Sequence, residues 1–200
     1  MPLDFTKIIS MTMPPLTEFS ISNYLSSVAE KQPVPGGGAV AAIVGAEACA
    51  LQTKVAVFSS NPEIAPIVES SKKTQRKLLK LAEKDSKAFL ALMKAGKKSK
   101  NYEELLIEAA RVPVEVLRMS VLQVSSLKVL LKLGNLNLVS DIGISALLLI
   151  SSIKSSLLNI KINTNSIESV PEDILLAEFS AEEALKELES LCLEVEDAIS

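Results

Sequence analysis

Apolar residues recur along the chain at intervals of three and four positions, which places side chains on one face of an α-helix. Alternation with period two, typical of half-buried strands, is almost absent. The pattern therefore predicts an all-α fold. Proline, glycine and asparagine positions set the boundaries of six expected helices, at about 19–32, 39–59, 63–95, 101–132, 138–162 and 181–199.

Two further local signals concern the fourth and sixth of these helices. Pro113 lies inside the fourth and should kink it. Ser180 and Glu183 have the spacing of a capping box, which predicts that the last helix begins at residue 181.

Composition limits the class of protein. A chain of 200 residues is expected to form a single domain, 1–200. Hydrophobic residues make up 48% of it while aromatic residues supply only 4%, so the excess is aliphatic and indicates a subunit interface. The net charge of −3, with both signs interspersed, lacks the basic footprint that nucleic-acid binding requires. We expect no nucleic-acid partner.

A membrane location is also not expected. The most apolar stretch, Ile142 to Ile153, is bounded by Asp141 and Lys154 and is shorter than the roughly 18 residues that a spanning helix needs. The first residues do not form a signal peptide, because Asp4 interrupts them. These features predict a cytoplasmic protein with no membrane partner.

Histidine is absent from the chain, and this restricts the chemistry. Imidazole bases, Ser-His and Cys-His pairs and the usual zinc sites are removed together. Cys49 and Cys192 lie far apart without ligands at metal-binding spacing, so we expect structural thiols and no metal site. Acid–base chemistry must come from carboxylates, lysines or tyrosines.

Asp85 breaks the pattern of the third helix. It falls within an apolar stripe formed by Leu78, Leu81, Ala82, Ala88, Phe89 and Leu92. Burial there would raise the carboxyl pKa toward the range useful for proton transfer near neutrality. Two structural alternatives remain open: Asp85 pairs with Lys84 or Lys87, or it caps a neighbouring helix.

Gly36, Gly37 and Gly38 precede the second helix. Their amides would lie at the positive end of the helix dipole, where an anionic group can be held. The alternative is a tight turn, and the spacing is not that of a phosphate-binding P-loop. In either case the bare glycines allow a ligand or another backbone to approach closely.

Polar residues also interrupt the fifth helix. Ser152, Ser156, Asn159 and Asn163 follow one another at helical spacing, and their partners could be another helix or a heteroaromatic ligand. A second polar group lies at the entrance of this helix and consists of Asn135, Asn137, Ser140 and Asp141, for which helix capping is the alternative role. Lys97, Lys98 and Lys100 form either a solvated loop or a guide for a polyanionic ligand tail.

Four of these segments together resemble a known family. The segments 34–42 (VPGGGAVAA), 84–89 (KDSKAF), 134–143 (GNLNLVSDIG) and 159–163 (NIKIN) match its signatures in order and spacing, and 111–119 (RVPVEVLRM) resembles an intervening helix. The chain is similar, over about residues 17–165, to the formiminotetrahydrofolate cyclodeaminase and methenyltetrahydrofolate cyclohydrolase family.

The resemblance implies a multihelical array that forms an antiparallel homodimer with a folate cleft near the interface. Members close 5-formiminotetrahydrofolate to 5,10-methenyltetrahydrofolate with loss of ammonia, or hydrate the methenyl compound to 10-formyltetrahydrofolate. Asp85 matches the family's catalytic aspartate and would be the general acid/base. The implied ligand is a tetrahydrofolate substrate, with no permanently bound cofactor. The residues expected to bind it are Gly36, Gly37, Gly38, Asn135, Asn137, Ser140, Asp141, Asn159 and Asn163.

Departures from the family pattern keep other functions open. Ala39 stands where the family usually has a serine after the three glycines, and the loop 95–101 differs from the family's sequence. A non-catalytic folate-binding or scaffold homolog is therefore the main alternative to an enzyme. A helical dimer without any ligand is the third possibility.

Overall fold

The computed structural model describes residues 14–200, and every regular element among them is a helix, which confirms the all-α prediction. Three short 3-10 turns occur at Leu16–Glu18, Pro62–Ile64 and Leu136–Leu138. The α-helices are α2 (Ile21–Ala29), α3 (Gly37–Val57), α4 (Ala65–Ala95), α5 (Tyr102–Val121), α6 (Val124–Leu133), α7 (Val139–Thr164) and α8 (Glu172–Ile199).

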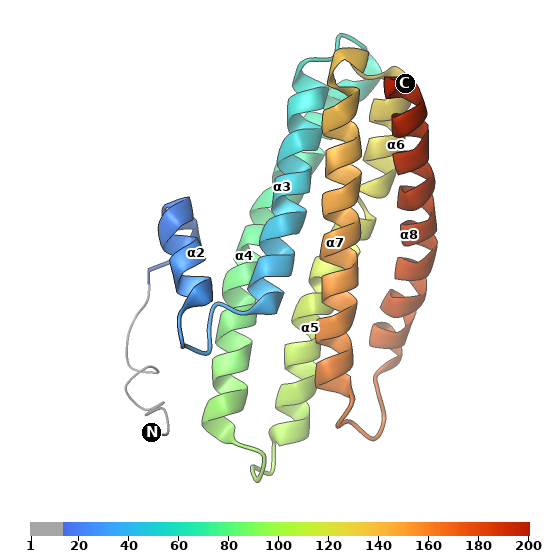
Figure 1. The fold of residues 1–200 in the computed structure, drawn as a ribbon. Coiled ribbons are helices and arrows are strands. Elements are labelled where there is room, and N and C mark those ends of the chain that lie inside the picture. Colours follow the sequence, from blue (N-terminus) through green and yellow to red (C-terminus); the bar gives the residue numbers. More distant parts are fainter. Residues whose placement is uncertain (1–13) are drawn as a thin grey trace.

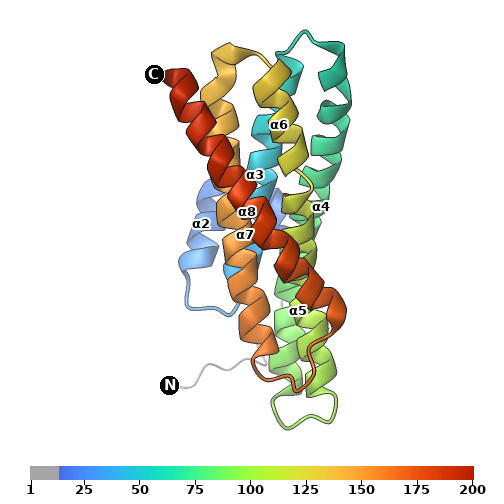
Figure 2. The ribbon, with the colours of Figure 1, turned by 90° about the vertical axis from the view of Figure 1, so that its right-hand side faces the viewer.

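The long helices form a multihelical array along one axis. Helix α3 packs against α4 and against α7, and α5 packs against both α4 and α7 (Figure 1). Helix α8 crosses this array obliquely over α5, α6 and α7 (Figure 2). The short α2 stands beside the array rather than within it (Figure 1). The beginning of α3 and the end of α7 therefore lie toward the same end of the array.

Small and polar residues set the close packing of α3 on α7. The Ser152 hydroxyl of α7 donates to the carbonyl of Ala41 in α3 at 2.8 Å and lies 3.0 Å from the Ser120 hydroxyl of α5. Gly45 leaves the room for this contact, because a Cβ there would lie 2.8 Å from Ser152 Oγ. The buried hydroxyl thus fixes the register of α7 against α3.

The smaller of the two largest apolar clusters lies between α3, α4 and α5, and it supports the beginning of α3. Its buried members are Ala39, Ala42, Ala46, Cys49, Leu78, Leu81, Ala82, Val112 and Val116. The alanines of α3 allow α4 to approach closely, because ridges of small side chains leave shallow grooves. This packing holds the segment of α4 that carries Asp85 next to the N-terminus of α3.

The prediction of one helix over 101–132 is wrong. The chain forms α5 and α6, and the break comes at Leu122 and Gln123, whereas α5 continues through Pro113. Gln123 is buried at the break, where its Nε2 donates to Thr74 at 3.1 Å and its Oε1 accepts from Ser71 at 3.2 Å. A tertiary contact to α4 therefore accompanies the interruption of the helix. The local sequence contains no proline or glycine that would have predicted this interruption.

The last helix begins nine residues earlier than predicted, at Glu172 instead of 181. Ser180 lies inside α8 and its hydroxyl donates to the Ala177 carbonyl at 2.8 Å, so it does not cap an N-terminus. The reason is the apolar face, which already starts at Ile174 and Ala177 and continues to Val195. Burial of this face outweighs a capping motif that contributes about 1 kcal/mol.

Two helices, Gly37–Val57 and Leu136–Thr164, are long and apolar enough to cross a membrane by length and composition. Core helices pass the same test, and 50% and 39% of their most apolar windows are buried inside the fold. The two helices also share a buried polar contact, from Gln52 to Ser145 at 3.3 Å. We therefore interpret both as core helices, and the expected absence of a membrane partner stays a prediction.

Candidate active site

A cavity of about 300 Å³ lies at the beginning of α3, where α4, α5 and α7 approach it. Both polar and apolar residues line it. The lining residues are Pro33, Val34, Gly36, Gly37, Gly38, Asp85, Ala88, Phe89, Ala109, Asn159, Ile162 and Asn163.

 The cavity thus brings together six of the ten predicted site residues: Gly36, Gly37, Gly38, Asp85, Asn159 and Asn163.

Asp85 of α4 lies directly against Gly38 in the first turn of α3. A Cβ at position 38 would overlap the carboxyl group, with Oδ2 only 2.7 Å away. The backbone amide of Ala39 donates a hydrogen bond to the same carboxyl group. Asp85 therefore caps α3, whose own N-cap residue, Gly36, has no side chain to do so. This arrangement supports the capping alternative.

Pairing with a lysine, the other structural alternative, is not observed. None of the ion pairs within residues 14–200 includes Asp85, Lys84 or Lys87. Burial raises the pKa of the Asp85 carboxyl above its ordinary value, while the hydrogen bond from Ala39 acts in the opposite direction and is the smaller effect. The result is a carboxyl group in a cavity whose pKa is displaced toward neutrality, as proton transfer requires.

Asn159 and Asn163 of α7 line the cavity. Their Nδ2 groups donate back to the carbonyls of Ser155 and Asn159, each at 2.9 Å, which leaves Oδ1 of both side chains as acceptors. Asn159 Oδ1 lies close to α3, since a Cβ at Gly37 would be 3.9 Å from it. The cavity therefore offers three side-chain acceptors, and no lysine or arginine lines it.

Phe89 is a cavity residue that the sequence pattern placed in the buried stripe. It is 45% exposed, although Leu78, Leu81, Ala82 and Leu92 are buried as expected. Its spacing of four residues from Asp85 is the signal that could have revealed it, because such pairs lie on the same helix face. Ala39, which was expected to face the cleft, has its side chain buried in the apolar cluster between α3, α4 and α5. It does not line the cavity, so only its backbone amide contributes to the site.

The remaining predicted residues, Asn135, Asn137, Ser140 and Asp141, lie at the far end of α3. The side chain of Asn135 donates to the Phe58 carbonyl at 3.1 Å, just beyond the C-terminus of that helix. Because α3 has 21 residues, its two ends are about 30 Å apart at 1.5 Å per residue. Within one chain these four residues are therefore separated from Asp85, contrary to the expectation of one site.

Local contacts account for part of this second polar group. Asn135 Oδ1 accepts from the backbone amide of Asn137 at 3.0 Å, so the asparagine caps a 3-10 turn. Asp141 pairs with Lys54 of α3 at 2.7 Å and lies in the first turn of α7, where a carboxylate is favoured by the helix dipole. Lys97, Lys98 and Lys100 are exposed in the loop after α4, and none of them lines the cavity.

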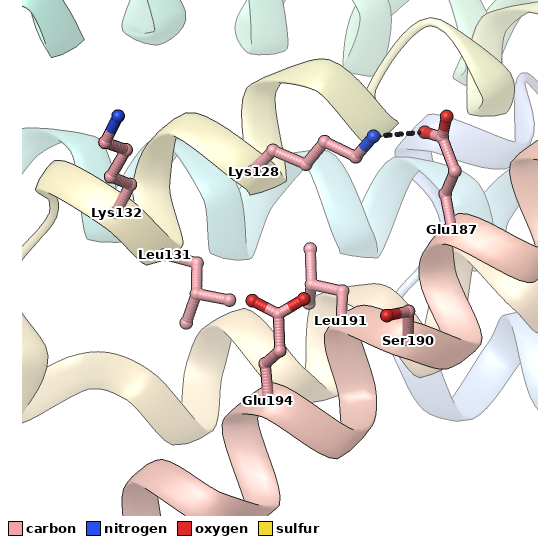
Figure 3. Close-up of a pocket in the computed structure, with 7 residues that line it drawn as sticks. All are labelled: Lys128, Leu131, Lys132, Glu187, Ser190, Leu191 and Glu194. Carbon is pink, nitrogen blue, oxygen red and sulfur yellow. Dashed lines mark ion pairs between the residues drawn. The ribbon is translucent and has the colours of Figure 1, made fainter.

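A second cavity, of about 530 Å³, lies between α6 and α8 (Figure 3). Its charged groups have both signs, and Lys128 pairs with Glu187 at 2.7 Å (Figure 3). None of the predicted site residues lines it. Within residues 14–200, no group of three or more His, Cys, Asp or Glu side chains could hold a metal ion. The candidate active site is therefore the cavity at Asp85.

Comparison with known proteins identifies the family of the chain. The chain is 29% identical to a methenyltetrahydrofolate cyclohydrolase of Methylorubrum extorquens, over 88% of this chain and 89% of that protein. Its structure is similar to that of a formiminotetrahydrofolate cyclodeaminase from Thermotoga maritima, with a TM-score of 0.82, 34% identity and coverage of 92% and 96% of the two chains. Residues 20–174, which contain all the cavity residues, match the sequence model of one family. The chain belongs to the formiminotransferase-cyclodeaminase family.

Proposed function

We propose that this protein is a folate one-carbon enzyme that acts at the carbon between N5 and N10 of tetrahydrofolate. The reaction is either cyclodeamination of 5-formiminotetrahydrofolate or hydrolysis of 5,10-methenyltetrahydrofolate. The observation that carries the proposal is the Asp85 carboxyl group, held in a cavity against Gly38 with a pKa raised by burial. The folate named in the two relatives supports the choice of substrate.

The charge of the cavity suits this substrate. Asp85, Asn159 and Asn163 present acceptor oxygens, and no cationic side chain lines the cavity. The pterin ring carries N–H donors, and the methenyl carbon carries a positive charge shared by two nitrogens. A carboxylate in a low-dielectric cavity stabilises such a cation more strongly than water does.

One carboxyl group can serve both reactions. In cyclodeamination, N10 attacks the carbon of the formimino group, whose imino nitrogen is protonated. Asp85 accepts the N10 proton and then donates it to the amino group, which leaves as ammonia. In hydrolysis, water attacks the methenyl carbon, Asp85 accepts a water proton and donates it to N5 as the carbon–N5 bond breaks. The remaining proton on the formyl oxygen passes to solvent. Both sequences need an acid/base whose pKa lies near the working pH.

The test is the ultraviolet absorbance of methenyltetrahydrofolate. We expect the purified protein to form this compound from 5-formiminotetrahydrofolate or to consume it, and the direction distinguishes the two reactions. Asp85→Asn should lose most of the rate, because an amide still accepts the Ala39 hydrogen bond but does not transfer the proton. Equal rates in the two proteins would refute the role of Asp85, and tight folate binding without turnover would favour a non-catalytic homolog.

We further propose that the protein acts as an antiparallel homodimer. Exposed apolar residues extend along α7 from the Asn135 end toward the cavity end, namely Ile144, Leu147 and Leu158, and Ile21 and Leu25 add to them on α2. Unpartnered apolar surface of this kind marks protein interfaces. A second copy in the opposite direction would bring its Asn135–Asp141 segment toward the Asp85 cavity. The two groups of family signatures, which lie at opposite ends of α3 within one protomer, would then meet across the interface.

Mixed dimers test this arrangement. The single variants Asp85→Asn and Asp141→Asn should each be weakly active or inactive. If the partner supplies Asp141, co-expression of the two variants should restore one intact site in each mixed dimer. No recovery of activity in verified mixed dimers would show that Asp141 does not complete the partner's site. A monomer by analytical ultracentrifugation would refute the dimer itself.

The cellular setting stays a prediction. The cytoplasmic location and the absence of a nucleic-acid partner rest on the composition and the net charge of −3.

A further inference from the structure

Phe89 and Ile162 expose apolar surface at the mouth of the Asp85 cavity. Phe89 of α4 is 45% exposed and Ile162 of α7 is 68% exposed, yet both line the cavity. Asp85 and Asn159 are less exposed than these two residues. The cavity is therefore polar at its inner part, beside the first turn of α3, and apolar where it opens.

Two small residues, Ala88 and Ala109, line the cavity together with Phe89. Their short side chains take up little of the cavity, which favours a flat ring as the group bound against Phe89. An exposed aromatic face loses little conformational entropy when a ring packs on it, and aromatic pairs gain affinity beyond simple burial of area. Phe89 follows Asp85 by four residues on α4, so their Cβ atoms are about 5–6 Å apart.

The chemistry of the proposed substrate relates these two positions. The reacting carbon is bonded to N10, and N10 carries the aryl ring of the folate directly. If Asp85 reaches the reacting carbon, the aryl ring must lie within one helical turn of it. On α4 that turn toward the mouth of the cavity carries Phe89.

We propose that Phe89, together with Ile162, binds the aryl ring on N10 and makes the enzyme specific for N10-aryl tetrahydropterins. The inference rests on the proposed function, since it assumes that the reacting carbon lies at Asp85. Phe89 contributes binding of the substrate rather than proton transfer. Its removal should therefore raise KM more than it lowers kcat.

The experiment compares two ligands, one of which carries the N10-aryl group and one of which lacks it. 5-Formyltetrahydropteroate carries the aryl ring without a glutamate tail, and 5-formyl-6-methyltetrahydropterin lacks the ring. Calorimetry with the full chain should show tighter binding of the pteroate. Phe89→Ala should weaken the pteroate roughly tenfold and leave the pterin unchanged, because an aromatic contact contributes up to about 1.5 kcal/mol. Phe89→Tyr, which keeps the ring face, should retain the preference.

Phe179→Ala is the matched control, because Phe179 is an exposed phenylalanine on α8 that lines neither cavity. It should leave both affinities unchanged. Phe89→Leu serves if Phe89→Ala does not fold, and it should also lower the preference for the pteroate. Equal weakening of both ligands by the Phe89 variants, or no change in either, overturns the inference while the proposed function stands. Wild-type protein that binds neither ligand overturns both.

Discussion

Gly38 and Asp85 are in such close contact that no side chain fits at position 38: a Cβ there would overlap the carboxyl group of Asp85. The backbone at Gly38 is not in the left-handed region, so the glycine is needed for space and not for conformation. This contact allows Asp85 to reach the amide of Ala39 and to cap α3.

Gly38→Ala should abolish most of the activity, because the methyl group displaces the Asp85 carboxyl from the cavity. Loss of the cap should also lower the free energy of unfolding, by about 1 kcal/mol. Gly36→Ala is the control for stability, since a Cβ there meets only the Pro33 carbonyl at 3.9 Å. Turnover of Gly38→Ala and urea unfolding of both variants measure the two effects. Equal stability in the two variants would contradict the contact.

Asp85→Asn and Asp85→Ala should separate the two roles of this residue. Both variants lack the carboxyl group, so both should lose activity. Only the alanine variant also loses the acceptor for the Ala39 amide, and it should be the less stable of the two by about 1 kcal/mol. Thermal or urea unfolding of the pair gives the difference, and identical stabilities would exclude a capping role for the side chain.

The raised pKa of Asp85 predicts a specific dependence on pH. The folded protein holds the proton to a higher pH than the unfolded chain does. Stability relative to Asp85→Asn should therefore decrease as pH rises from the ordinary aspartate pKa of 3.8 through the raised value, and stay constant above it. If the carboxylate is the working form, kcat/KM should increase through the same raised pKa. A stability difference that grows with pH would mean that the pKa is lowered instead.

Ser152→Ala should destabilise the fold, by about 1–2 kcal/mol, because it leaves the Ala41 carbonyl without its interhelical donor. Ser151 provides the control, since it precedes Ser152 on the same helix but is exposed. Ser151→Ala should change the free energy of unfolding by less than about 0.5 kcal/mol. Urea unfolding of both variants measures the difference. Equal effects would indicate that helix propensity, and not the α3–α7 contact, is responsible.

The helical fold could be predicted from the sequence, because apolar residues that recur every three to four positions reflect only the local geometry of a helix. It also singled out Asp85, since a carboxylate within an apolar stripe is visible without any structure. The glycines at 36–38 and the asparagines at 159 and 163 were found in the same way, as exceptions to a local pattern. The motif resemblance to the family is confirmed by the match over residues 20–174.

The tertiary structure alone decided which of these residues meet. It placed the Asn135 group at the other end of α3 from Asp85, interrupted the predicted fourth helix at Gln123, and turned Phe89 from an expected core residue into part of a cavity mouth. The physical reason is that local periodicity gives the face of each helix but not its neighbour. Which faces pack together depends on contacts between residues far apart in the chain, such as the bond from Ser152 to Ala41.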